Sequence, residues 1–160
     1  MTESEAANYC VWLLGQQARS EKELGDRLTK KGVEEEIILA ALERVRSWGY
    51  LDDAALAERW VASRGKTRGK YLLRQELNRK GLDAAEALES RTDDDEKTAC
   101  LTVAIKRVGD PPKDRSREAQ AKLSSFLQRR GFGWDAIRPV MRQLYQGIVA
   151  EDLDAAEVED

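Results

Sequence analysis

Apolar residues recur along the chain at intervals of three and four, which is the spacing of one face of an α-helix. This spacing predicts a first helix over residues 4–17. It predicts a later helix whose apolar face carries Ile38, Ala41, Leu42, Val45 and Trp48. No segment alternates between apolar and polar residues for long enough to indicate a β-strand. The pattern therefore predicts an all-α fold.

One short pattern occurs three times: leucine, three residues, leucine, one further residue, two bases, glycine and a large apolar residue. The three segments are ELGDRLTKKGV (23–33), LLRQELNRKGL (72–82) and KLSSFLQRRGF (122–132). Their glycines are almost equally spaced, at positions 32, 81 and 131. Self-similarity at a fixed period indicates repeats of one supersecondary unit. We therefore expect three tandem three-helix repeats that form an elongated molecule, either straight or curved.

The repeated pattern also predicts how its helix begins and ends. Ser20 and Glu23 have the spacing of a capping box, so the second helix of the first repeat begins there. Bases in a last helical turn complement the helix dipole, and glycine readily takes the left-handed conformation that ends a helix. We expect this role for Gly32, Gly81 and Gly131. The apolar residue after each glycine is expected to fold back against the helix just ended.

The same signals place the boundaries of the repeats. Gly49 ends the last helix of the first repeat, and Asp52 and Asp53 are suitable N-cap residues for the second. The third repeat begins near Thr92, with the acidic run 93–96 in its first helical turn. The expected division is repeat 1 at 1–50, repeat 2 at 51–91, repeat 3 at 92–147 and an acidic, flexible tail at 148–160.

Charge is distributed unevenly. The formal net charge is -3, but residues 151–160 hold six acids and no base, so the rest of the chain is net positive. Between residues 59 and 80 there are eight bases and a single acid, whereas residues 83–96 are strongly acidic. Such segregation favours a polyanionic partner. A solvated helical face neutralised by its neighbours in space is the alternative.

The basic residues are the candidates for binding. For Lys30 and Lys31, complementing a helix dipole and binding a partner are equally good interpretations. Helix dipoles cannot account for a loop with four bases, which indicates an anionic partner. This loop carries Arg64, Lys66, Arg68 and Lys70.

The sequence contains no pattern that supports catalysis or metal binding. The chain has no histidine, and Cys10 and Cys100 are expected to be buried, reduced thiols. Residues 65–67, Gly-Lys-Thr, match the last three residues of a phosphate-binding loop. The first glycine of such a loop would stand at position 60, where this chain has Trp60. The run 93–96 is expected to cap a helix rather than bind a metal. We expect no enzyme activity, no cofactor, no bound metal, no membrane segment and a cytoplasmic location.

Three segments carry a family resemblance. They are GYLDDAALAERWVASR (49–64), RQELNRKG (74–81) and KLSSFLQRRGF (122–132). With them, approximately residues 9–145 resemble the RecX family, small modulators of the RecA recombinase. The combination of GYLDD, an aromatic residue three positions before Ser-Arg, and QEL followed by Lys-Gly is specific to that family.

The resemblance implies a fold of tandem three-helix repeats and a regulatory role in recombination, DNA repair and the SOS response. Proteins of this family bind along the groove of the RecA filament on single-stranded DNA and perform no chemistry. They block filament growth and lower ATP hydrolysis, strand exchange and cleavage of the SOS repressor. The implied protein is a monomer with weaker direct binding to single- or double-stranded DNA. The alternative is a nucleic-acid-binding repeat protein for which the contact with RecA is secondary.

Carried onto this chain, the resemblance yields two sets of residues. The candidates for contact with the filament or with DNA are Lys30, Lys31, Arg64, Lys66, Arg68, Lys70, Arg74, Gln75, Arg79, Lys80, Arg129 and Arg130. The structural positions are Gly32, Gly49, Tyr50, Leu51, Asp52, Asp53, Trp60, Gly81 and Gly131. The chain departs from the family in a shorter loop after Arg64, an alanine-rich helix at 83–91 and an acidic tail without a counterpart.

Overall fold

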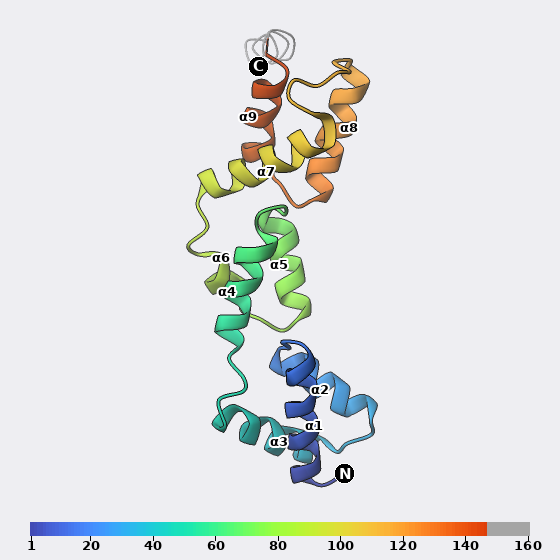
Figure 1. Ribbon diagram of the computed structural model, residues 1–160, viewed down its shortest axis with the longest axis vertical. Helices are drawn as coiled ribbons and strands as arrows, with labels where there is room; N and C mark the ends of the chain where they lie inside the picture. Colours follow the sequence, from blue (N-terminus) through green and yellow to red (C-terminus); the bar gives the residue numbers. More distant parts are fainter. Residues whose placement is uncertain (147–160) are drawn as a thin grey trace. The chain divides into compact units, whose positions relative to one another are not determined.

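The computed structural model describes residues 1–146, and every regular element in that range is an α-helix (Figure 1). The prediction of an all-α fold is confirmed. None of the helices within residues 1–146 combines the length and the apolar character that crossing a bilayer requires. The acidic tail predicted for residues 148–160 lies outside the described residues.

The chain divides into two compact units. One comprises residues 1–61 and 76–87, and the other comprises residues 62–75 and the chain from residue 88 onward. The division passes through α4 (Asp53–Arg64) and α5 (Lys70–Arg79), the two longer helices of the second repeat. The repeat boundaries expected from the sequence stay a prediction.

The first unit is built around α1 (Glu3–Gln16), α2 (Glu21–Lys30) and α3 (Glu35–Ser47). The capping box predicted at Ser20 is present, with the Ser20 hydroxyl accepting from the Glu23 amide and the Glu23 carboxylate accepting from the Ser20 amide. The three helices enclose one apolar core. Its members are Ala6, Ala7, Cys10, Leu13, Leu24, Leu28, Ile38, Ala41, Leu42 and Val45.

Trp48 does not belong to this core, and the prediction that it lies on the buried face of its helix is wrong. Its side chain is 47% exposed. Helix α3 ends at Ser47, so Trp48 is the C-cap residue, and the Arg44 guanidinium lies 5.7 Å from its ring centroid. The four smaller apolar residues of α3 form its buried face.

The short helix α6 (Ala84–Leu88) completes the first unit, where Ala84 and Ala87 are buried. The sequence predicted an alanine-rich helix at 83–91, and the observed helix is shorter, with five residues.

The second unit is built around α7 (Asp93–Val108), α8 (Arg117–Arg129) and α9 (Trp134–Leu144), which lie together in Figure 1. Thr92 and Asp95 form a capping box at the start of α7, as the acidic run predicted. One apolar face of α9 is buried throughout. It consists of Ile137, Val140, Met141 and Leu144.

The three glycine turns have the predicted conformation. The φ angles of Gly32, Gly81 and Gly131 are +80°, +73° and +93°. After each glycine, the next amide donates to the carbonyl five residues earlier, which closes the helix end. Leu82 and Phe132 are buried, and Val33 is half-buried against the first core.

Candidate partner-binding surface

The loop with four predicted bases joins α4 to α5 and has a defined backbone. We call residues 65–69 the basic loop. The Arg91 guanidinium donates to the carbonyl oxygens of Gly65 at 2.9 Å and Arg68 at 3.0 Å. The Arg130 guanidinium donates to the carbonyl oxygen of Thr67 at 2.9 Å. Because these carbonyls have protein partners, the loop does not depend on water to satisfy them.

Arg91 is itself held by Glu96. The Arg91 Nε and Glu96 Oε1 atoms are 2.5 Å apart, and the two side chains are 9% and 7% exposed. The sequence predicted that the acidic run 93–96 caps a helix, and Glu96 lies in the first turn of α7, where it is buried. Glu96 lies three, four and seven residues before the buried Ala99, Cys100 and Val103, so it shares their face of α7.

A signal for this pair was available in the sequence, because Arg91 is the single base of the acidic stretch 83–96. A lone base among acids is a natural partner for a buried carboxylate. The sequence alone did not indicate that the Arg91 guanidinium would also reach two loop carbonyls.

Several predicted binding residues of the second unit have exposed side chains. Lys66, Arg74 and Arg129 are exposed, and none forms an ion pair with a residue among 1–146. Arg64 and Gln75 are also exposed. Lys70 is 32% exposed and lies 3.8 Å from Asp135. Arg68 is only partly exposed. Arg64 is the last residue of α4 and Lys70 the first of α5, so both border the loop.

Tyr71 lies beside two of these cations. Its side chain is 52% exposed. The Lys70 ammonium is 5.3 Å and the Arg74 guanidinium 5.8 Å from the ring centroid. Lys70 precedes and Arg74 follows Tyr71 along α5, so one helix presents an exposed ring with positive charge around it. We call Lys66, Lys70, Tyr71 and Arg74 the basic surface.

Two predicted binding residues make contacts inside the protein instead. The Lys80 ammonium lies 4.5 Å from the Trp60 ring centroid and 3.2 Å from Glu23 Oε2, and its side chain is 20% exposed. Trp60 is half-buried. Arg130 bonds to the basic loop. A contact of either residue with a partner stays a prediction.

The remaining predicted bases lie near the glycine turns of the first unit. Lys30 and Arg79 are exposed and end their helices. Lys31 is exposed, and its ammonium lies 4.3 Å from the Tyr9 ring centroid.

The GYLDD segment forms the connection between α3 and α4, as the resemblance implied. Gly49 has φ +83° and ends α3. Tyr50 is exposed and Leu51 packs against the first core. Asp52 accepts from the Ala55 amide at 3.0 Å and caps α4. Asp53 accepts from the Glu21 amide at 3.1 Å, and burial raises the pKa of this carboxyl group.

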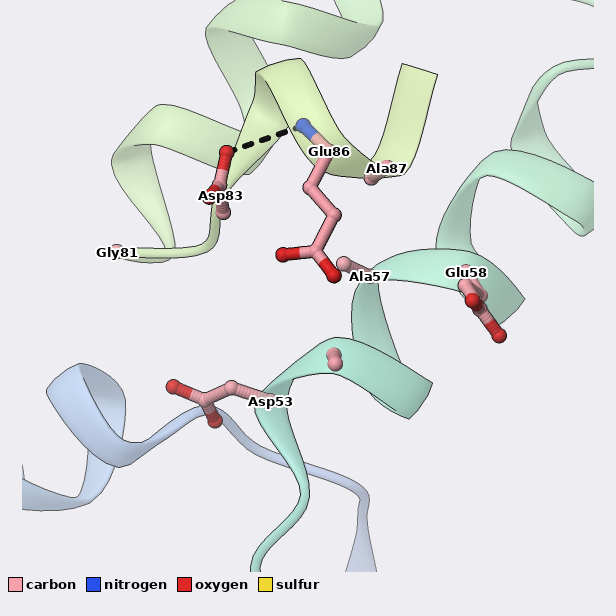
Figure 2. Close-up of a pocket in the computed structure, with 8 residues that line it drawn as sticks. Asp53, Ala57, Glu58, Gly81, Asp83, Glu86 and Ala87 are labelled. Carbon is pink, nitrogen blue, oxygen red and sulfur yellow. Dashed lines mark hydrogen bonds between the residues drawn. The ribbon is translucent and has the colours of Figure 1, made fainter. Parts of the chain in front are cut away.

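The cavity in the first unit has the wrong charge for a polyanion. It measures about 280 Å³ and lies between the starts of α4 and α6 (Figure 2). Four carboxylates line it, and Asp83 accepts from the Glu86 amide at 3.1 Å. The four carboxylates that line the cavity belong to Asp53, Glu58, Asp83 and Glu86. Within residues 1–146 no group of acidic or cysteine side chains is arranged to hold a metal ion.

The two cysteines are buried and form no disulfide, as predicted. Burial raises the pKa of both thiols, that of Cys100 to about 12. Thiolate chemistry at neutral pH is thereby disfavoured.

Three family models match successive parts of the chain. They describe the first three-helix domain of RecX at residues 6–44, the second at 52–89 and the third at 94–141. Together they cover each of the three glycine turns.

Characterised relatives and solved structures agree with these matches. A regulatory protein RecX from Chlorobium phaeobacteroides is 33% identical over 150 residues, which are 90% of this chain and 96% of the relative. Another, from Deinococcus radiodurans, is 34% identical over 139 residues, 85% of this chain and 66% of the relative. A crystal structure of RecX from Lactobacillus salivarius is similar with a TM-score of 0.75 and 26% identity, covering 89% of this chain and 96% of that one.

Proposed function

Because the chain belongs to the RecX family, we propose that it regulates the RecA recombinase by binding its filament on single-stranded DNA. In this proposal it catalyses no reaction of its own. It acts in the cytoplasm as a monomer, inhibits ATP hydrolysis, strand exchange and filament growth, and thereby modulates recombination, DNA repair and the SOS response.

The observation that carries the proposal is the basic surface. Lys66 and Arg74 are exposed without a carboxylate partner among residues 1–146, although acidic residues are abundant in the chain. Arg91 and Arg130 fix the adjoining loop through its carbonyls. A loop that is already ordered loses less conformational entropy when it binds, so this surface is suited to binding a polyanionic filament.

The decisive assay is ATP hydrolysis by RecA on single-stranded DNA with this protein titrated in. We expect inhibition at stoichiometric or lower amounts. Unchanged hydrolysis at a several-fold excess, with the chain folded by circular dichroism, would contradict the proposal.

A second candidate function is direct binding to nucleic acid. Tyr71 favours it, because an exposed ring beside two cations can stack on a base while the cations contact phosphates. This candidate predicts tight binding to bare single-stranded DNA that weakens steeply with salt. Fluorescence anisotropy at two salt concentrations separates the two functions. Tight filament binding with feeble binding to bare DNA favours regulation of RecA.

A further inference from the structure

Neighbouring repeats are joined at corresponding positions in both units. In the first unit, the Ser20 hydroxyl donates to the carbonyl oxygen of Lys80 at 2.5 Å. In the second unit, the Gly69 amide donates to the carbonyl oxygen of Arg130 at 2.8 Å. Ser20 and Gly69 immediately precede α2 and α5, and Lys80 and Arg130 immediately precede a glycine turn. Each contact therefore joins the start of one repeat's middle helix to the glycine turn of the next repeat.

In the first unit this joint also includes an ion pair. The Lys80 ammonium lies over the ring of Trp60, from its own repeat, and pairs with Glu23, the third residue of α2. Hydrogen bonds from the Ser20 amide and from Lys80 outweigh the effect of burial and lower the pKa of the Glu23 carboxyl group. The joint thus contains a hydroxyl cap, an acid at the third helical position and a cation held over an aromatic ring.

The first repeat has the same glycine turn, at Lys31 and Gly32. The Lys31 ammonium lies over the Tyr9 ring at 4.3 Å, as Lys80 lies over Trp60. Among residues 1–146, no group hydrogen-bonds to the Lys31 carbonyl and no carboxylate pairs with its ammonium.

The space around the glycines agrees with this difference. A Cβ atom on Gly32 would meet nothing within 4 Å, whereas one on Gly81 would lie 2.7 Å from the Lys22 side chain. On Gly131 it would collide with Leu72. The Lys31–Gly32 turn is therefore an unoccupied copy of a contact that the protein makes twice elsewhere.

The middle helices of a second copy of this chain do not supply the missing half. The starts of α2 and α5 are already occupied. In the third repeat, α8 begins at Arg117. Measured back from the glycine of each repeat, this start is about one turn earlier than the start of α2. The counterpart of Ser20 is therefore Ala119, which lies inside α8. The counterpart of Glu23 is Lys122, which would repel Lys31. The complementary helix is therefore not a middle helix of this chain. The start of α1 also has threonine at the N-cap and glutamate at the third position, so a concentration-dependent dimer of the chain alone would identify a second copy, and not another protein, as the occupant.

We propose that the Lys31–Gly32 turn binds the N-terminus of a helix from another protein, with serine or threonine at the N-cap and glutamate at the third helical position. The hydroxyl donates to the Lys31 carbonyl, and the glutamate pairs with the Lys31 ammonium over Tyr9. Serine or threonine followed by glutamate at this spacing is a common helix start, so suitable partners are abundant. This surface is distinct from the basic surface, and the inference does not require the partner to be RecA.

The test uses the full-length chain and a stapled helical peptide that copies residues 19–29, RSEKELGDRLT. Stapling is needed because so short a helix is marginal in water. We expect titration of the peptide to cause saturable NMR shifts of the Gly32 and Val33 amides. A peptide with Glu23→Lys should bind about fivefold more weakly, as expected for loss of one partly exposed ion pair.

A charge exchange completes the test. The Lys31→Glu chain should bind the parent peptide more weakly and regain affinity for the Glu23→Lys peptide, whereas Lys30→Glu should leave binding of the parent peptide unchanged. The inference would be overturned by any of three results. These are no saturable shift at Gly32, shifts confined to Gly81, or affinities that stay unchanged in both charge-reversed molecules. Because RecA is absent, these failures are distinct from a failure of the ATPase assay.

Discussion

Arg91 pairs with the buried Glu96 and, from the same guanidinium, donates to two carbonyls of the basic loop. A buried carboxylate thereby fixes the backbone that carries exposed cations. The pair links the stability of the second unit to the shape of the surface that we propose for binding.

Replacing Arg91 with methionine should be strongly destabilising, because it leaves Glu96 buried without its partner. We expect a loss of about 3 to 5 kcal/mol in the free energy of unfolding, measured by urea denaturation. The double variant Arg91→Met with Glu96→Met should recover most of that loss, since apolar pairs often replace buried ion pairs well. A loss below about 1 kcal/mol in the single variant would contradict the structural role assigned to the pair.

Gly81 and Gly32 provide a matched pair for separating backbone strain from contact between repeats. Both have positive φ, so alanine at either position should cost about 1 to 2 kcal/mol in the left-handed conformation. Alanine at Gly81 should cost more, because its Cβ would also press on Lys22, whereas the space around Gly32 is open. Equal losses in thermal or chemical denaturation would show that the Gly81 turn does not pack as described.

Glu23 should make the stability of the first unit depend on pH. Its pKa is lowered in the folded protein, so its contribution is present above the pKa of the unfolded chain and is lost as pH falls through the folded value. We therefore expect the Glu23→Gln variant to lose less stability between pH 7 and acid than the parent. Glu36→Gln, at an exposed position on α3, is the control and should follow the parent curve.

Charge reversal at Lys66 should impair inhibition of RecA without affecting folding. Lys66 is exposed and makes no ion pair among residues 1–146, so Lys66→Glu should keep the parent melting temperature within a few degrees. We expect a higher concentration of this variant to be needed for half-maximal inhibition of the ATPase. Lys113→Glu, on another exposed loop of the same unit, should inhibit like the parent. If both variants inhibit equally, the basic surface is not the site of contact.

Local signals in the sequence were sufficient for much of the fold. The three glycine turns and the capping boxes at Ser20 and Thr92 depend on residues within one or two helical turns of each other, and all are present. Trp48 was misplaced because its spacing continues the apolar face past the point where α3 ends.

The contacts between repeats could not be predicted in the same way. Lys80 and Arg130 carry the sequence signature of surface bases, yet each bonds to a residue more than fifty positions earlier in the chain. Burial of Glu96 likewise depends on Arg91 lying between α7 and the loop carbonyls. These features arise from the packing of repeats, which residue spacing within one repeat does not encode.

The extra turn at the start of α8 limits how this architecture can grow. A fourth module appended after α9 would find neither a free cap nor an acid to receive its glycine turn. Lengthening the protein at that end would require a shorter α8. Engineering of longer arrays should therefore begin by trimming α8.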